Sequence, residues 1–334
     1  MYALLKPLLF RMDPAKAHKL AMSALGAVEH VAPLRAGIRR VLDPRLSVRA
    51  MGIDFPSPIG LAGGFDKNAE RAVALASLGF GHLELGTVTA LAQEANPTPN
   101  LFRLSADRAL VNRLGFPNEG AAVVAARIAE RKSRVGVPVG VSIGKSRAVA
   151  VEDAIEDYLA SFRAVSAVAD FVVVNVSSPN TKDLRALQAA DAARALFDAL
   201  APEKSRVPIL VKIAPDLADD AIDAICDAAR EAKLAGVVAT NTTIAREGLA
   251  TPADVVERIG AGGLSGRPLR ARSLAVVRRV RDRVGTGMCV IGVGGIDSAD
   301  AALEMMRAGA DLVQLYTAFV YEGPLLPRRI ARDL

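Results

Sequence analysis

The segment Phe171-Val-Val-Val-Asn-Val-Ser-Ser-Pro-Asn-Thr181 decides the fold that this sequence predicts. Its first half is an apolar, β-branched run, which is typical of a strand buried on both faces. Pro179 cannot donate a hydrogen bond to a sheet and restricts the residue before it, so the strand has to end there. The strand end carries Asn175, Ser178 and Asn180. In parallel α/β proteins such ends form active sites, although the same residue types also cap helices.

Similar apolar runs recur along the chain, and most are followed by Gly, Asn, Ser or Thr and then by a helical pattern. The predicted strands are Pro58–Ala62, His82–Gly86, Pro138–Ile143, Phe171–Val176, Pro208–Ile213, Gly236–Thr240, Met288–Val293 and Asp311–Tyr316. Helical patterns include Asn68–Leu78, Ala154–Val168, Ala218–Ala232 and Ser298–Ala308. This alternation predicts a (β/α)8 TIM barrel rather than a doubly wound sheet. A dinucleotide-binding Gly-x-Gly-x-x-Gly fingerprint does not follow the first strand.

Residues 1–40 differ from the barrel region, residues 41–334, and predict a small N-terminal helical extension. Leucines 4, 5, 8 and 9 form one apolar ridge, and a second ridge runs from Ala17 to Val28. Asp13-Pro14 supplies an N-cap and a first-turn proline for the second helix. Two short amphipathic helices fit this pattern. They either dock on the barrel or lie in a membrane interface, as the interspersed lysines and arginines permit.

Composition narrows the classes of function. The 334 residues include 51% hydrophobic ones, enough for a large core, and carry a formal net charge of +6. The basic residues are spread along the chain without a basic run or aromatic platform, so no nucleic-acid partner is expected. Cys226 and Cys289 have no metal-ligand spacing and resemble buried thiols of a reducing compartment. No apolar stretch of about 18 residues predicts a membrane span, and no signal peptide is expected.

Polar residues follow nearly every predicted strand. They are Gly63 to Asn68, Thr87, Ser142, Lys145, Asn175, Ser178, Asn180, Thr181, Lys212, Thr240 to Thr243, Gly294, Gly295, Tyr316 and Thr317. Two long connections add Leu101–Leu104 with Ala109–Phe116, a predicted hairpin across the mouth, and Gly262–Pro268. This set is rich in amides and hydroxyls but poor in His and carboxylate, unlike a metal hydrolase or a glycosidase site. It suits a planar, amide-rich, anionic ligand, with a phosphate after the seventh and eighth strands.

Lys212 leaves three interpretations open. A lysine at the mouth of a barrel can form a Schiff base with a carbonyl substrate. It can also stabilise an electron-rich flavin, or it can be a structural lysine whose stem crosses the core.

Seven motifs, in order, resemble the membrane-associated, quinone-dependent (class 2) dihydroorotate dehydrogenases over nearly the whole chain. They are Gly60-Leu-Ala-Gly-Gly-Phe-Asp-Lys-Asn68, Asn112-Arg-Leu-Gly-Phe116, Asn175-Val-Ser-Ser-Pro-Asn-Thr181, Val211-Lys-Ile-Ala-Pro-Asp216, Thr240-Asn-Thr-Thr243, Gly262-Gly-Leu-Ser-Gly-Arg-Pro-Leu269 and Ile291-Gly-Val-Gly-Gly-Ile-Asp297. The resemblance implies FMN-dependent oxidation of (S)-dihydroorotate to orotate in pyrimidine biosynthesis. It implies a membrane quinone as acceptor and peripheral association with the cytoplasmic face of the cell membrane.

The resemblance also implies roles for residues. FMN would contact Ala62, Gly63, Gly64, Phe65, Asp66, Thr87, Ser142, Asn175, Lys212, Thr240, Gly266, Gly295, Tyr316 and Thr317. Dihydroorotate would contact Lys67, Asn112, Arg113, Leu114, Gly115, Phe116, Asn175, Asn180, Asn241 and Thr242. Ser178 matches the catalytic base, where class 1 enzymes have Cys, and Thr181 and Phe116 match residues that hold and shield a relaying water. No metal is implied.

Two residues of the predicted FMN site depart from the pattern of the family. Ser142 replaces a flavin-contacting Asn, and Thr317 replaces a common Ser, so both keep a hydroxyl. His18 and Arg103 are candidates for the quinone path. A class 1 dihydroorotate dehydrogenase or a tRNA dihydrouridine synthase is the alternative interpretation.

Overall fold

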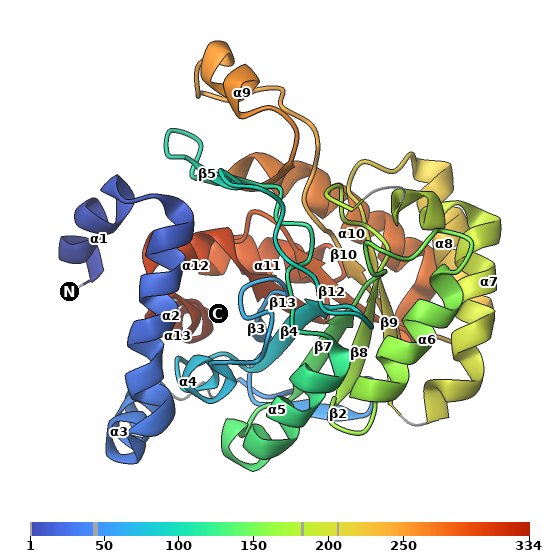
Figure 1. Cartoon of the computed structure of the whole chain (residues 1–334), viewed down its shortest axis with the longest axis horizontal. Helices are drawn as coiled ribbons and strands as arrows, with labels where there is room; N and C mark the ends of the chain where they lie inside the picture. The colour runs from blue at the N-terminus through green and yellow to red at the C-terminus, as the bar shows by residue number, and fades with distance from the viewer. Residues whose placement is uncertain (1, 43–45, 182–183, 206) are drawn as a thin grey trace.

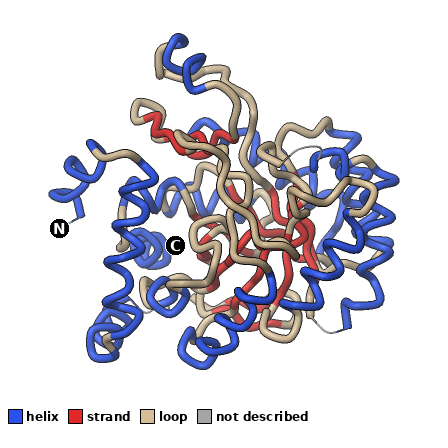
Figure 2. The backbone as a smooth tube through the Cα atoms, in the orientation of Figure 1, coloured by secondary structure: helices blue, strands red, loops and turns tan. Residues whose placement is uncertain are grey.

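Eight parallel strands close into a barrel, which confirms the (β/α)8 prediction (Figures 1 and 2). The computed structural model describes residues 2–42, 46–181, 184–205 and 207–334. The barrel strands, in chain order, are β3 (Ile59–Leu61), β4 (His82–Val88), β7 (Val139–Ile143), β8 (Phe171–Asn175), β9 (Ile209–Ile213), β10 (Gly236–Ala239), β12 (Cys289–Val293) and β13 (Leu312–Leu315). Each pairs with the next in parallel register, and β13 pairs with β3 to close the barrel.

Helices surround the strands on the outside, and each barrel strand is buried on both faces. The helices are α4 (Ala72–Ala76), α5 (Ala121–Val135), α6 (Ala154–Val165), α7 (Ala190–Leu200), α8 (Asp219–Glu231), α10 (Arg270–Val284), α11 (Ala299–Arg307), α12 (Thr317–Glu322) and α13 (Leu326–Asp333). Short 3-10 helices are η1 (Leu184–Gln188), η2 (Ala201–Ser205), η3 (Arg267–Leu269) and η4 (Gly285–Gly287). The apolar core therefore has two layers, one inside the barrel and one between strands and helices.

The first barrel helix is shorter than its sequence pattern predicts. The pattern covers Asn68–Leu78, but α4 begins only at Ala72. The carboxylate of Asp66 accepts hydrogen bonds from the backbone N–H groups of Glu70 and Arg71, at 2.9 and 2.8 Å. These contacts hold the preceding residues in an irregular turn, so the helix starts one turn late.

A three-stranded antiparallel sheet lies at the mouth of the barrel. The predicted hairpin is present as β5 (Leu101–Leu104) and β6 (Ala109–Asn112), and β11 (Gly263–Gly266) adds a third strand beside β6. The sequence did not predict β11 as a strand, because its Gly-Leu-Ser-Gly composition has low strand propensity. The same long loop carries α9 (Ala253–Ile259), which projects from the barrel in Figure 1.

A second hairpin, also missed in the sequence, closes the opposite end of the barrel. Strands β1 (Val48–Ala50) and β2 (Ile53–Phe55) pair across Met51 and Gly52, whose φ angles of 43° and 79° define a tight hairpin turn. The ring of Phe55 lies 5.4 Å from that of His82 and 6.4 Å from that of Phe171. These aromatic contacts pack the end of the barrel that lies opposite the mouth.

The N-terminal extension contains three helices rather than the predicted two. They are α1 (Tyr2–Arg11), α2 (Pro14–His30) and α3 (Ala32–Leu42), along one side of the barrel in Figure 1. Proline and glycine within α3 obscured its pattern. The side chain of Asp13 caps α2 as predicted, accepting from the N–H groups of Ala15 and Lys16 at 3.0 Å. None of the helices in the described ranges is long and apolar enough to cross a membrane.

The second helix of the extension is fixed to the barrel by a buried carboxylate. Glu29 accepts a hydrogen bond from the backbone N–H of Ala74 at 2.8 Å and lies 3.4 Å from the Arg131 guanidinium. Arg71 donates to the carbonyl of Met22 at 2.8 Å. By contrast, Leu4 and Leu8 of α1 are 84% and 64% exposed. The extension therefore combines a docked helix with an exposed apolar one.

Candidate active site

A cavity open to solvent lies at the C-terminal ends of the barrel strands. The predicted site residues that line it are Ala62, Gly63, Gly64, Lys67, Thr87, Asn112, Leu114, Gly115, Phe116, Asn175, Ser178, Asn180, Lys212, Thr240, Asn241, Thr242, Gly266, Gly295, Tyr316 and Thr317. Residues from all parts of the barrel sequence therefore meet at one mouth, as parallel strands require.

A chain of hydrogen bonds fixes Asn175 at the end of β8. Its amide nitrogen donates to the hydroxyl of Thr87 at 3.0 Å, and Thr87 contacts the hydroxyl of Ser142 at 2.9 Å. Its amide oxygen accepts from the hydroxyl of Ser177 at 2.9 Å. Tyr158, from α6, donates to its backbone carbonyl at 2.9 Å. Because both ends of the amide are held, the orientation of the Asn175 side chain is fixed.

Three further asparagines, Asn112, Asn180 and Asn241, line the mouth of the cavity. Asn241 donates to the hydroxyl of Ser177 at 2.9 Å and accepts from the N–H of Thr242 at 2.7 Å. Asn180 donates to the amide oxygen of Asn112 at 3.1 Å, which ties the β8 loop to the sheet at the mouth. Side-chain amides both donate and accept, so this wall can match the N–H and C=O edges of a planar heterocycle.

Ser178 lies within this amide cluster and is 4% exposed. Its hydroxyl accepts a hydrogen bond from the backbone N–H of Asn180 at 3.2 Å. The ring of Phe116 lies in the wall of the same cavity, on backbone with a φ of 55°. The Thr181 hydroxyl is buried and has no hydrogen-bond partner within the described part of the chain.

Two lysines supply positive charge to the cavity wall. Lys212, from β9, lies 3.0 Å from the Glu84 carboxylate, which projects from β4, and both side chains are buried. Lys67 donates to the carbonyl of Gly64 at 2.7 Å. Burial lowers the pKa of Lys67 from 10.5 to about 8, although the nearby Asp66 carboxylate acts in the opposite direction.

Five predicted site residues lie behind the cavity wall rather than in it. Phe65 packs on His18, Tyr316 and Phe319, and the Asp66 carboxylate holds the turn before α4. Arg113 donates to the carbonyls of Pro99 and Ile259 and so supports the sheet at the mouth. Ser142 contacts the cavity only through Thr87, and Thr181 lies beneath the β8 loop. Of the other strand-end candidates, Lys145 donates to the carbonyl of Ser146 at 3.0 Å, away from the cavity.

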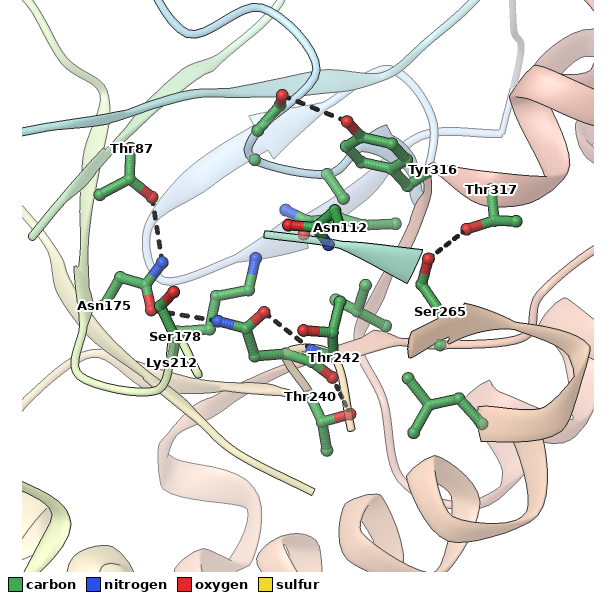
Figure 3. A pocket seen from close by; sticks show the side chains of 18 of the residues that line it. Thr87, Asn112, Asn175, Ser178, Lys212, Thr240, Thr242, Ser265, Tyr316 and Thr317 are labelled. Carbon is green, nitrogen blue, oxygen red and sulfur yellow. Dashed lines mark hydrogen bonds between the residues drawn. The ribbon is translucent and has the colours of Figure 1, made fainter. Parts of the chain in front are cut away.

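Four polar residues at or beside the cavity were absent from the predicted site residues: Glu84, Ser177, Ser265 and Gln314. Glu84 lies two residues after the inward-facing His82, so strand alternation was the signal that placed it inside the barrel. Ser265 contacts the hydroxyl of Thr317 at 2.8 Å, as Figure 3 shows. Gln314 is buried in the cavity wall, and neither atom of its amide has a partner among the residues that the structure describes.

Three comparisons with known proteins give one result. Residues 45–334 match the family model described as dihydroorotate dehydrogenase. The chain is 53% identical to dihydroorotate dehydrogenase (quinone) of Rhodococcus opacus, with 100% of this chain and 94% of the relative covered. It is 50% identical to the protein of the same name from Mycobacterium tuberculosis, with 100% and 92% covered. DHODH from Eimeria tenella in complex with ferulenol superposes with a TM-score of 0.86 at 36% identity, over 96% of this chain and 90% of that one.

The fold, the cavity and these matches define the class as the FMN-dependent (β/α)8-barrel oxidoreductases. Within that class, the chain belongs to the dihydroorotate dehydrogenase family. The family converts dihydroorotate into orotate in pyrimidine biosynthesis, so the family and cofactor predicted from the sequence motifs are confirmed.

The residues of the cavity fit FMN. The unpartnered amide of Gln314 offers a donor and an acceptor to a flavin ring edge. Ser298 caps α11 by accepting from the N–H of Ala301 at 3.1 Å, and the Gly294-Gly295 backbone before it lines the cavity. Exposed backbone N–H groups at a helix start suit a phosphate. Within the described ranges, no group of three or more His, Cys, Asp or Glu residues is placed to hold a metal ion.

Proposed function

We propose that this cavity oxidises (S)-dihydroorotate beside bound FMN and that a membrane quinone accepts the electrons. One observation carries the proposal: the Ser178 hydroxyl and four asparagine amides, drawn from three separate segments of the chain, line the same cavity as Lys212. Quinone is the acceptor that the names of the relatives give for those proteins.

FMN would be held by the backbone at Ala62, Gly63 and Gly64, the hydroxyls of Thr87, Thr240 and Thr317, the Asn175 amide, Lys212, and the backbone at Gly266, Gly295 and Tyr316. Asp66, Phe65 and Ser142 would support these contacts from behind the wall. Bound FMN supplies the two-electron oxidant for the reaction. Gln314 would pair with the remaining ring edge. The groups that would touch FMN all line the cavity. Behind them, Ser142 contacts the Thr87 hydroxyl, Phe65 packs against the ring of Tyr316, and Asp66 holds the turn before α4.

Dihydroorotate has a carboxylate and alternating ring N–H and C=O groups. Lys67 would balance the carboxylate, and Asn112, Asn180 and Asn241 would pair with the ring edges. The backbone at residues 113–116 and the Thr242 hydroxyl would complete the enclosure, with the Arg113 guanidinium holding that segment in place. Because these groups both donate and accept, they would discriminate against ligands that lack the matching pattern.

Ser178 would remove the proton from C5 of the substrate. A serine is a weak base at neutral pH, so the proton has to pass onward. The unpartnered hydroxyl of Thr181 would bind a water that takes the proton, and the Phe116 ring would shield that water from bulk solvent. Within the described ranges the Ser178 hydroxyl accepts one hydrogen bond, from the N–H of Asn180, which does not use the hydroxyl proton needed for this transfer.

The N-terminal helices would bring the quinone to the barrel. The apolar face of α1 and Leu20 of α2 would enter the surface of the cell membrane from its cytoplasmic side, while Lys6, Lys16 and Lys19 meet anionic headgroups. Arg103 lies 4.8 Å from the Phe10 ring and donates to the carbonyl of Met12 at 2.7 Å, next to α1. The His18 ring packs edge-to-face against that of Phe65, with 5.1 Å between the ring centres. Burial, reinforced by Lys67, lowers the pKa of His18 to about 4, so a neutral imidazole would border this path.

The reaction is tested by mixing the holoenzyme anaerobically with dihydroorotate and following bleaching of the flavin. A short-chain quinone should then restore the flavin spectrum, whereas fumarate should not. A flavin that dihydroorotate fails to bleach contradicts the proposed reaction, and rapid reoxidation by fumarate contradicts the proposed acceptor class.

Membrane association needs a separate test in the full chain. Replacing both Leu4 and Leu8 with Glu should abolish sedimentation with anionic vesicles and slow reduction of a long-chain quinone, because two charges replace exposed apolar side chains. Flavin bleaching by dihydroorotate should stay at the wild-type rate. Unchanged vesicle binding in this variant contradicts the assignment of α1.

A further inference from the structure

The ion pair between Glu84 and Lys212 is the most deeply buried one at the cavity. The Lys212 ammonium lies 3.0 Å from one carboxylate oxygen of Glu84, with side-chain exposures of 6% for the lysine and 0% for the glutamate. The second carboxylate oxygen of Glu84 has no hydrogen-bond partner among the described residues. The carboxylate therefore has Lys212 as its main electrostatic neighbour, and the contact joins β4 to β9 across the barrel.

The backbone next to the cavity leaves room for this carboxylate. Gly63 lines the cavity directly, and a side chain placed there would overlap the carboxylate of Glu84. Glu84 itself does not line the cavity. Its charge is therefore separated from the cavity by little more than the peptide at Gly63, so it acts on a ligand without touching it.

Glu84 also changes the charge that the cavity presents. The charged side chains of the described lining are Lys67 and Lys212, both positive, and the lining includes no carboxylate. Figure 3 shows the Lys212 side chain extending toward the cavity. Without Glu84, the deep part of the cavity would present an uncompensated positive charge. A flavin ring gains negative charge when it is reduced, so such a charge would favour the reduced form.

We propose that Glu84 is a positioning residue and the fixed counter-ion of Lys212. It holds the ammonium against the cavity and limits the preference of the site for reduced over oxidised FMN. This inference rests on the proposed function, since it requires FMN in this cavity. Its consequence is that Glu84 keeps bound FMN a strong enough reductant to pass its electrons on to the next acceptor.

The test is the midpoint potential of FMN in the holoenzyme, measured by spectrophotometric titration against a dye of known potential. Glu84→Gln keeps the size of the side chain but removes its charge, so the affinity ratio for reduced over oxidised FMN should rise at least tenfold. For a two-electron couple, a tenfold change corresponds to about 30 mV. Lys212→Met should lower the ratio at least tenfold, because it leaves the carboxylate alone beside the cavity.

Two more variants separate charge from general disturbance. Glu84→Asp keeps the charge and should stay within about threefold of the wild-type ratio, given that Coulomb energy falls slowly with distance. The double variant Glu84→Gln with Lys212→Met removes both charges and should return close to wild type. Removing both partners of a buried pair is also less disruptive than removing one. Ser161→Ala, which alters a buried hydroxyl in α6, should leave the potential unchanged.

A potential that stays constant or falls in Glu84→Gln overturns the inference. If Glu84→Gln does not retain FMN, the double variant Glu84→Gln with Lys212→Met decides. A midpoint potential near that of the wild type supports the role of Glu84. A midpoint potential as low as that of Lys212→Met refutes it. Failure of the proposed function would look different, because the wild-type protein would then show no bleaching by dihydroorotate at all.

Discussion

Replacing Ser178 with Ala should stop the chemistry while leaving the binding site intact. Among the residues that the structure describes, the Ser178 hydroxyl accepts one hydrogen bond, from the N–H of Asn180 at 3.2 Å, so its removal breaks one weak hydrogen bond at a nearly buried position. Orotate affinity should therefore change by less than about threefold, equivalent to roughly 0.6 kcal/mol. Loss of a general base should slow flavin reduction by about 10² to 10⁴, which adds roughly 3 to 5 kcal/mol to the barrier.

The assay is stopped-flow absorbance of the flavin after anaerobic mixing with saturating dihydroorotate, together with a titration of orotate by its effect on the flavin spectrum. Ser178→Cys is the matched variant. A thiol ionises near pH 8.5, so this variant should regain part of the rate and gain more as the pH rises toward 9. Flavin reduction in Ser178→Ala at the wild-type rate would show that another group removes the proton.

Three other outcomes follow from the geometry. Because the pKa of Lys67 is about 8, orotate affinity should weaken as the pH rises above 8. Lys67→Arg keeps its charge at high pH and should remove this dependence. An equal loss of affinity in the Lys67→Arg variant would assign the pH dependence to another group. Asn180→Ala should weaken orotate binding by about 1 to 2 kcal/mol and barely alter FMN retention, as fluorescence titration would reveal; equal loss of both ligands contradicts the separate subsites. Burial lowers the pKa of His82 from 6.5 to about 3. Between these two pH values the unfolded state binds a proton that the folded state does not. The free energy of unfolding should therefore fall by about 1.4 kcal/mol for each pH unit as the pH drops from 6.5 toward 3. Denaturant titrations of His82→Leu should show a shallower decline, and an unchanged slope rules out His82 as its source.

The barrel could be predicted because parallel strands covered on both faces leave long apolar runs in the sequence. All eight barrel strands fall within two residues of their predicted ends. The elements that were missed have weak patterns of their own. Strand β11 is half glycine and forms only against β6, and β1 with β2 is held by the packing of Phe55 inside the barrel.

The site was predictable where its residues follow strand ends and not where it depends on tertiary pairing. Asn175, Ser178 and Asn180 lie in one motif, so their convergence followed from the barrel alone. The pairing of Glu84 with Lys212 joins residues 128 positions apart, and nothing local in either strand indicates the partner. Phe65 and Asp66 belong to a motif of the site, yet aromatic packing and the turn before α4 direct their side chains away from the cavity.

The most direct test of the central claim is a single anaerobic titration of the holoenzyme. Addition of one equivalent of dihydroorotate should bleach the flavin and produce orotate, and a subsequent addition of quinone should restore the oxidised spectrum within the turnover time. A flavin that stays oxidised in the presence of dihydroorotate, or that is reduced but not reoxidised by quinone, contradicts the assignment of this cavity to a quinone-linked dihydroorotate dehydrogenase.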